Sequence, residues 1–357
     1  MKQNLLLVWD RLGDYHRARW RALQAAGGER RVYAADLGAA DALYGWQNTD
    51  ETETYLRLSD KPVTTFDLPA RLRNFQRALD AHDIGHVALA GYGRPEYLAM
   101  LWAARRRGCR TLLFAESWYG ANAPLNRAKG AVLNRAVDGW LVSGVRAFDH
   151  FRDQIGVDPA RMRTGYSVVD NAHFATGAPG EAGRKPVLLC VARFALEKNL
   201  DALIRAFLRS DLAAGWELRI VGGGPLRDEL EALARPEVVT LHDWVSYDEL
   251  PNLYAAAAAF VLPSTFEPWG LVVNEAMAAG LPVLVSHECG CAPDLVDAAT
   301  GWRFHASHED ELIDRLNQLS TLPEADRKAM GQSACQKIDA YSPATWAHAA
   351  HELLTVP

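Results

Sequence analysis

Apolar residues along this chain alternate between short continuous runs and longer amphipathic stretches, and the series occurs twice. Short apolar runs separated by helical patterns are typical of a parallel sheet with helices on both faces. The runs predict strands at 4–10, 32–36, 86–90, 111–115, 139–143, 187–191, 217–221, 238–241, 259–262 and 283–286. Helices are predicted at 16–26, 70–81, 96–107, 125–134, 200–210, 226–234, 247–257, 271–279, 324–340 and 343–354.

The two series predict two domains, which a length of 357 residues also favours. Residues 175–185 are rich in Gly, Ala and Pro and lack periodicity, so they are predicted to link a first domain (1–174) to a second (186–342). The last helix, at about 343–357, is expected to pack back on the first domain. The predicted fold class is α/β, with two Rossmann-like, doubly wound parallel sheets, and ligands are expected at the carboxyl ends of the strands.

Composition supports a globular protein, with 49% hydrophobic and 23% charged residues. No run approaches the ~18 residues that a membrane span needs, and the N-terminus lacks a signal-peptide pattern, so a cytoplasmic location is expected. Residues 1–175 hold 24 Lys and Arg against 19 Asp and Glu, whereas the rest hold 14 against 25. This asymmetry indicates either an anionic partner for the first half or a solvated surface of mixed charge. No nucleic acid partner is expected.

The cysteines are five in number and scattered. Cys289 and Cys291 could form half of a metal site, but no second Cys or His pair lies at matching spacing, which favours buried thiols.

The most specific segment runs from Pro263 to Pro282 and contains two glutamates, Glu267 and Glu275. It follows a predicted strand, passes through a loop and enters a helix. The backbone N–H groups of Gly270, Leu271 and Val272 would be unsatisfied at the start of that helix, which is suited to a diphosphate. The two carboxylates suit sugar hydroxyls, one on a transferred sugar and one on a ribose.

This segment resembles the Glu-x7-Glu motif of the retaining GT-B glycosyltransferases, in particular the sucrose-synthase-like group (family 4). Residues 190–199, 220–225, 289–296 and 166–174 resemble further segments of that family. The resemblance implies that Arg193 and Lys198 grip the donor diphosphate, and fixed cations of this kind would stabilise the leaving group. Gly222 and Gly223 would let backbone approach the nucleoside, or they form a purely structural turn.

Other positions match the family less closely. Asp243 stands where the family usually has Gly, near the base, so the nucleotide is left open between UDP and GDP. Gly13 matches one position of a Gly loop against the diphosphate. His16, Arg94 and Glu116 follow predicted strands and are candidates for acceptor contacts or proton handling.

The resemblance implies a retaining hexosyltransferase that moves a sugar from a nucleotide-diphosphate donor to a glycan or lipid-linked acceptor, in surface polysaccharide or glycoconjugate synthesis. Glu267, Arg193 and Lys198 would act in catalysis, Glu267 by positioning the sugar. The chain lacks an Asp-x-Asp pair, so neither a metal nor another cofactor is expected. Arg105–Arg107 and the helix at 125–135 suggest peripheral contact with an anionic membrane, or a solvated face.

Three other function classes share parts of this pattern. A dinucleotide dehydrogenase is disfavoured because no Gly-x-Gly-x-x-Gly motif opens the first helix. A sugar-nucleotide epimerase of similar layout and a non-catalytic nucleotide-sugar-binding subunit remain alternatives.

Overall fold

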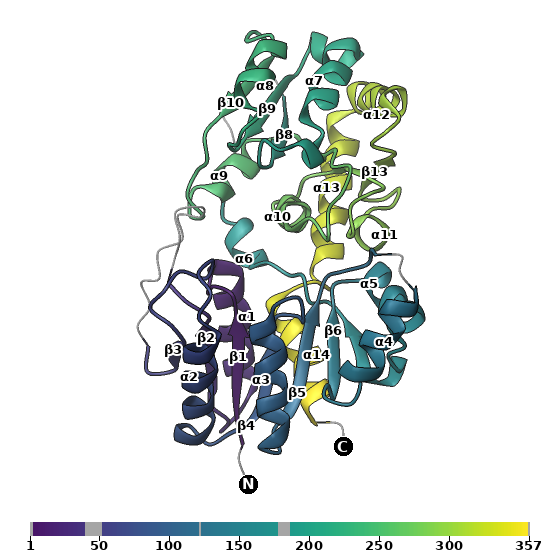
Figure 1. The fold of residues 1–357 in the computed structure, drawn as a ribbon. Coiled ribbons are helices and arrows are strands. Elements are labelled where there is room, and N and C mark those ends of the chain that lie inside the picture. Colours follow the sequence, from purple (N-terminus) through teal and green to yellow (C-terminus); the bar gives the residue numbers. More distant parts are fainter. Residues whose placement is uncertain (1–2, 40–51, 121–122, 178–185, 356–357) are drawn as a thin grey trace. The chain divides into compact units, whose positions relative to one another are not determined.

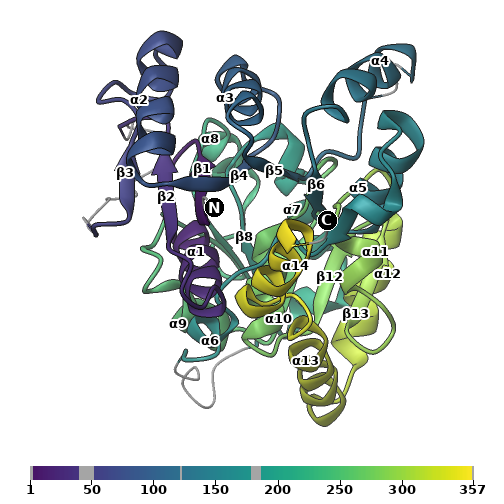
Figure 2. The ribbon, with the colours of Figure 1, turned by 90° about the horizontal axis from the view of Figure 1, so that it is seen from below.

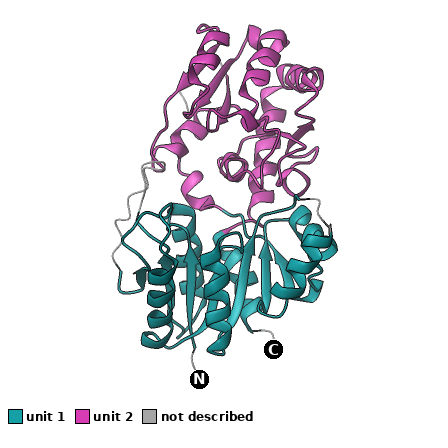
Figure 3. Ribbon diagram, viewed as in Figure 1, with its two compact units in different colours: residues 1–168, 343–357 teal, residues 169–342 magenta. Residues whose placement is uncertain are grey.

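The computed structural model describes residues 3–39, 52–120, 123–177 and 186–355, and it divides the chain into two compact units (Figures 1 and 3). Unit 1 comprises residues 1–168 together with 343–357, and unit 2 comprises residues 169–342. The division falls six residues before the predicted end of the first domain. Most of the predicted linker, residues 178–185, lies outside the described residues.

Unit 1 is built on a parallel sheet of seven described strands in the order β3-β2-β1-β4-β5-β6-β7 (Figure 1). The strands are β1 (Asn4–Trp9), β2 (Val32–Asp36), β3 (Tyr55–Arg57), β4 (Ile84–Leu89), β5 (Arg110–Ala115), β6 (Gly139–Val142) and β7 (Met162–Thr164). Nearly every residue of β1, β2, β5 and β6 is buried, as expected for inner strands covered on both faces. Residues 166–170, which follow β7, do not form a strand.

Helices cover both faces of this sheet (Figure 2). They are α1 (Asp14–Ala26), α2 (Leu68–Ala81), α3 (Pro95–Arg106), α4 (Ala123–Leu133), α5 (Val145–His150) and α14 (Pro343–Thr355). Helices α1 and α14 pack against each other on one face, and α2 and α3 pack together on the other (Figure 2). The buried Trp346 of α14 lies 5.6 Å from the ring of Phe114 in β5, so the last helix forms part of the core of unit 1.

Unit 2 contains a parallel sheet of six described strands in the order β10-β9-β8-β11-β12-β13. The strands are β8 (Val187–Val191), β9 (Glu217–Val221), β10 (Val239–His242), β11 (Ala259–Leu262), β12 (Val283–Ser286) and β13 (Gly301–Phe304). The helices are α6 (Asn171–Phe174), α7 (Leu200–Arg209), α8 (Arg227–Leu233), α9 (Leu250–Ala255), α10 (Leu271–Ala278), α11 (Ala292–Leu295), α12 (Glu309–Thr321) and α13 (Glu324–Ile338).

Strand β11 shows how the sheet of unit 2 is covered on both faces. Ala259 and Val261 belong to the hydrophobic core that includes residues of α7 and α12. Phe260 points to the other face, where its ring lies 5.8 Å from that of Tyr254 in α9. Successive side chains of a strand alternate between faces, so a wholly apolar strand requires helices on both.

The predicted fold class, two doubly wound parallel-sheet domains, is confirmed. No helix in the described parts of the chain combines the length and the apolar character needed to cross a bilayer.

Candidate functional site

The strand order of unit 2 has a topological switch at β8. Strand β9 lies on one side of β8 and β11 on the other, so the connections that leave β8 and β11 diverge at the carboxyl edge of the sheet. Ligands of open α/β sheets bind at such a point. The loop after β8 carries Arg193 and Lys198, and the loop after β11 carries Glu267. All three residues predicted to act in catalysis therefore lie at this switch.

The glycine turn after β9 holds the loop that carries Arg193. Phe194 N–H donates to the carbonyl of Gly223 at 2.8 Å. A Cβ on Gly222 would lie 1.9 Å from the carbonyl oxygen of Ala192, which no real side chain tolerates. At least one glycine of this turn is thus required for close packing of two loops. Approach of the turn to a nucleoside stays a prediction.

Lys198 and Glu267 form an ion pair across the switch point. Their side chains are only 13% and 16% exposed, so both charges are largely withdrawn from water. Asn199 fixes this arrangement, because its amide donates to the carbonyl of Pro263 at 3.3 Å, just after β11. Arg193 is more accessible to water than Lys198, since its side chain is 55% exposed, and it donates to Glu197 at 2.7 Å.

The loop between β11 and α10 is held by backbone bonds to the segment after β12. Glu267 N–H donates to Glu288 at 3.3 Å, and Gly290 N–H donates to Glu267 at 2.9 Å. Gly270 then turns the chain into α10 with a φ of +104°, a left-handed conformation that favours glycine. Among the described residues, no acceptor occupies the N–H groups of Gly270, Leu271 or Val272. The predicted helix N-terminus is therefore present, with its donors available.

The second glutamate of the motif is buried. Glu275 is 1% exposed and accepts a hydrogen bond of 2.6 Å from the hydroxyl of Tyr254 in α9. Tyr254 is itself buried and contacts the ring of Phe174 in α6. Glu275 thus joins α10 to α9 in this structure, and its contact with a ribose stays a prediction.

Arg227 is a residue of this site that sequence reasoning missed. Its guanidinium pairs with Asp243 after β10, donates to the carbonyl of Gly222 at 3.3 Å and lies 5.2 Å from the ring centre of Phe194. Trp244, which follows Asp243 in the chain, lies beside Gly223, and its side chain is 55% exposed. Asp243, which stands where the family usually has glycine, therefore pairs with Arg227 and holds its guanidinium against the glycine turn after β9.

Unit 1 has a cavity of about 590 Å³ at the carboxyl ends of β1, β4 and β5. All three acceptor-side candidates line it, namely His16, Arg94 and Glu116. Burial, and next Arg19, hold the pKa of His16 well below its usual value, so its imidazole is neutral at pH 7. Gly13 is not among the lining residues; it precedes α1, and its N–H donates to Nδ1 of His16 at 3.2 Å.

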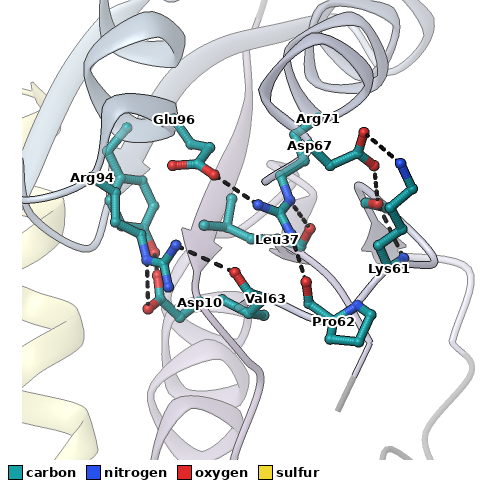
Figure 4. A network of polar contacts seen from close by, with 11 residues as sticks. Asp10, Leu37, Lys61, Pro62, Val63, Asp67, Arg71, Arg94 and Glu96 are labelled. Carbon is teal, nitrogen blue, oxygen red and sulfur yellow. Dashed lines mark hydrogen bonds and ion pairs between the residues drawn. The ribbon is translucent and has the colours of Figure 1, made fainter. Parts of the chain in front are cut away.

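Charged groups in this cavity are fixed by partners (Figure 4). Arg94 donates to Asp10 at 3.0 Å and to the carbonyl of Val63 at 3.4 Å. Tyr97 donates to the other oxygen of Asp10 at 2.6 Å. Burial, followed by Asp10, raises the pKa of Tyr97 well above its usual value, so Tyr97 stays a donor. Glu116 accepts from Ser167 at 2.6 Å.

A buried ion pair lies close to Arg94, outside the residues that line the cavity (Figure 4). Arg71 of α2 is fully buried and donates to Glu96 at 2.7 Å, to the carbonyl of Leu37 at 2.8 Å and to that of Pro62 at 3.0 Å. Glu96 lies in the first turn of α3, two residues after Arg94. This network, which sequence reasoning missed, ties the loops after β2 and β3 to the start of α3 and so positions Arg94.

Residues 174–337 match the sequence model of the family described as "Glycosyl transferases group 1". A GDP-mannose-dependent alpha-(1-6)-phosphatidylinositol monomannoside mannosyltransferase from Mycobacterium tuberculosis is 32% identical over 306 residues, which is 78% of this chain and 76% of that protein. The chain belongs to this family of glycosyltransferases.

Other relatives match a shorter region. Sulfoquinovosyl transferase from Arabidopsis thaliana is 31% identical over 161 residues, covering 44% of this chain but 31% of that protein. A glycogen synthase from Deinococcus deserti is 32% identical over 196 residues, covering 53% of this chain and 43% of that protein. The chain thus spans less than half the length of these curated relatives.

Solved structures share the fold over the whole chain. Sucrose-phosphate synthase from Thermosynechococcus elongatus has a TM-score of 0.77 at 18% identity and covers 98% of both chains. An Anabaena protein solved in complex with UDP and glucose has a TM-score of 0.76 at 15% identity and covers 99% of both.

These matches confirm the predicted resemblance to a glycosyltransferase family, and the solved structures confirm the predicted fold. The family model spans Arg193, Lys198, Glu267 and Glu275, whereas the cavity of unit 1 lies outside it. Retention of configuration and the narrower family-4 assignment stay predictions.

Proposed function

We propose that this chain is a retaining, metal-independent hexosyltransferase of family 4 that moves a sugar from a nucleotide-diphosphate donor to a glycan or lipid-linked acceptor. The observation that carries the proposal is the Lys198–Glu267 pair beside the available N–H groups that begin α10. One cation, one carboxylate and a helix N-terminus at one switch point suit a diphosphate joined to a hydroxylated sugar.

Relatives support the classes of donor and acceptor. The mycobacterial relative is named for GDP-mannose and for a phosphatidylinositol monomannoside, a lipid-linked sugar. The Anabaena structure is described as a complex with UDP and glucose. A UDP- or GDP-linked hexose is therefore the donor to test, and synthesis of surface glycans or glycolipids is the role to which it would belong.

Negative charge gathers on the diphosphate as the bond between the anomeric carbon and the phosphate oxygen breaks. Arg193 and Lys198, together with the N-terminus of α10, would stabilise that charge, so no divalent ion or other cofactor is needed. Gly222 and Gly223 would admit the nucleoside, with Glu275 towards the ribose. The acceptor hydroxyl attacks from the face that the diphosphate leaves and forms the new glycosidic bond. Its proton passes to the departing phosphate oxygen, and Glu267 positions the sugar.

The cavity of unit 1 is the proposed acceptor site. Neutral His16, with Nδ1 already accepting from Gly13, has its proton on Nε2 and can donate to an acceptor oxygen. Arg94 and Glu116 supply one cationic and one acidic group, each already fixed by a protein partner. Such a mixed polar lining suits sugar hydroxyls rather than an apolar ligand.

Peripheral contact with an anionic membrane is proposed for α4. Its exposed residues include Leu125, Arg127, Lys129 and Val132, and the two apolar side chains are 49% and 50% exposed. Exposed apolar side chains among cations are typical of interfacial helices. The Arg105–Arg107 run contributes less, because its first and last residues pair with Asp138 and Asp80. Co-sedimentation with phosphatidylglycerol vesicles at low salt tests this contact, which a failure to sediment would exclude.

The deciding experiment combines thermal stability with turnover. A nucleotide sugar at a hundred times its dissociation constant should stabilise the chain by about 2.7 kcal/mol. Lys198→Met should abolish stabilisation by UDP or GDP, whereas Lys328→Met, in an exposed Lys–Glu pair of α13, should not. Glu267→Gln should keep nucleotide binding but lower turnover about 100-fold or more.

Distinct outcomes would contradict the proposal. Undiminished turnover of the Glu267→Gln variant would remove Glu267 from the mechanism. Conversion of the donor into its epimer without acceptor would favour a sugar-nucleotide epimerase, and donor binding without turnover of any acceptor would favour a non-catalytic subunit.

A further inference from the structure

Two histidines and a glutamate come together at the carboxyl edge of the sheet in unit 2, outside the residues assigned to the donor. His287 follows β12 directly, and His305 follows β13 directly. These strands are paired so that Ser286 lies opposite Phe304, which places the two histidines side by side, with ring centres 4.4 Å apart. Glu311 lies in the first turn of α12, which begins just after β13.

The side chains present converging ligand atoms. One ligand atom from each of His287, His305 and Glu311 lies within 4.8 Å of the other two. Nδ1 of His305 is 3.0 Å from Oε2 of Glu311. A tetrahedral zinc ion with bonds of about 2.0 Å needs ligand atoms about 3.3 Å apart. The ligand atoms of His305 and Glu311 are therefore already close to that spacing. The ligand atom of His287 would have to move towards them by at most about 1.5 Å.

We propose that His287, His305 and Glu311 bind a first-row transition-metal ion of the Zn²⁺ type. Two imidazoles and one carboxylate are a ligand set that suits zinc, and they leave a fourth position for water. Arg315, 3.6 Å from the other oxygen of Glu311, would orient the carboxylate from outside the site. The ion is separate from the donor diphosphate, since neither Arg193 nor Lys198 belongs to the cluster.

The ion would tie together two loops that support the donor-side residues. Ala306, next to His305, accepts from the amide of Asn199 at 3.1 Å, and Asn199 is the neighbour of Lys198. Glu288, next to His287, accepts from the N–H of Glu267 at 3.3 Å. A further hydrogen bond, 3.0 Å long, joins Ala306 N–H to the Glu288 carboxylate. A metal bridge between the two histidines would therefore stiffen the support of the Lys198–Glu267 pair. Metal binding itself does not depend on the proposed function.

Calorimetric titration of the untagged chain with Zn²⁺ tests the site. One equivalent should bind, and His287→Asn, His305→Asn and Glu311→Gln should each weaken binding by more than about 10-fold. His242→Asn, which changes an exposed histidine of β10, should bind as tightly as the parent chain. Unchanged melting temperatures of the metal-free variants would show that they fold. Absence of binding by the parent chain at micromolar Zn²⁺, or equal binding by the three variants, would overturn the proposal.

Hydrogen exchange tests the bridge independently of any enzymatic reaction. Zn²⁺ should slow exchange of the Gly290 N–H, which donates to Glu267, in the parent chain but not in His305→Asn. Stoichiometric binding with no change in exchange at residues 286–291 would contradict the bridging role.

Discussion

Breaking the buried Arg71–Glu96 pair should destabilise unit 1 strongly and leave unit 2 unchanged. The side chains are 0% and 3% exposed, so neither charge can be satisfied by water if its partner is lost. Glu96→Ala leaves the guanidinium with the carbonyls of Leu37 and Pro62 alone. Loss of one member of a buried pair costs about 3–5 kcal/mol, and we expect that range.

The double variant separates the pair from the packing around it. Arg71→Met leaves the buried carboxylate of Glu96 and the buried carbonyl of Leu37 without their donor, so it should cost at least as much as Glu96→Ala. Combining Arg71→Met with Glu96→Leu removes both charges and should cost several kcal/mol less than the sum of Arg71→Met and Glu96→Leu, each measured as a single variant. Arg107→Ala, which breaks an exposed pair with Asp80, should cost about 1 kcal/mol or less.

Urea-dependent hydrogen exchange is the suitable assay, because two units need not unfold together. Peptides from β1 and β4 should lose protection in Glu96→Ala, while peptides from β8 and β11 provide the internal control. If the free energy of unfolding measured for β1 and β4 falls by less than about 1 kcal/mol, the reasoning is refuted, because an exposed ion pair contributes that much. Additive costs in the double variant would refute it equally.

Three further predictions concern glycines and pH. Gly270→Ala, at a φ of +104° and with its Cβ 3.0 Å from a leucine of β11, should cost about 1–3 kcal/mol in a denaturant titration and lower turnover. Gly280→Ala, with a φ of +77° and open space, should cost less and spare turnover. Gly222→Ala should displace the Arg193 loop and weaken nucleotide binding in calorimetry, whereas Gly215→Ala, in open space, should not. Burial, followed by Arg30 and Arg110, lowers the pKa of His86 from 6.5 to about 4. Its neutral form is therefore favoured by folding, and the stability it contributes is present above pH 6.5 and lost as the pH falls towards 4. His86→Gln should flatten that acid loss in melting curves from pH 7 to 4, and an unchanged slope would contradict the assignment.

Strands were predicted best where both faces are buried. The sequence predicted β8, β11 and β12 with their observed bounds, because a continuous apolar run indicates burial on both sides. It missed β3 and β7, which have three residues each and lie at the edges of the sheet of unit 1. It also missed β13, in which buried and partly exposed residues mix, and α12. Short edge strands have too few residues for a pattern to be recognised.

The sequence predicted which residues belong to the candidate site but not which of them contact one another. A local motif places Glu267 in a loop before a helix, but no local pattern reveals that Lys198, 69 positions earlier, is its partner. Arg71 was missed because a helical arginine is ordinarily exposed, and its three acceptors come from three separate segments. The buried contact of Glu275 with Tyr254 likewise depends on the packing of α9 against its neighbours.

The Lys198–Glu267 ion pair would favour the intact nucleotide sugar over the free nucleoside diphosphate at the proposed donor site. Both side chains are largely withdrawn from water, so each charge needs a partner. Under the proposed function, a diphosphate takes Lys198 as its counterion, and Glu267 then loses its cation. Hydroxyl groups of the donor sugar can replace that cation by donating to the carboxylate, whereas a free nucleoside diphosphate cannot. The exchange of partners therefore favours the intact nucleotide sugar, because it satisfies both members of the pair that it separates.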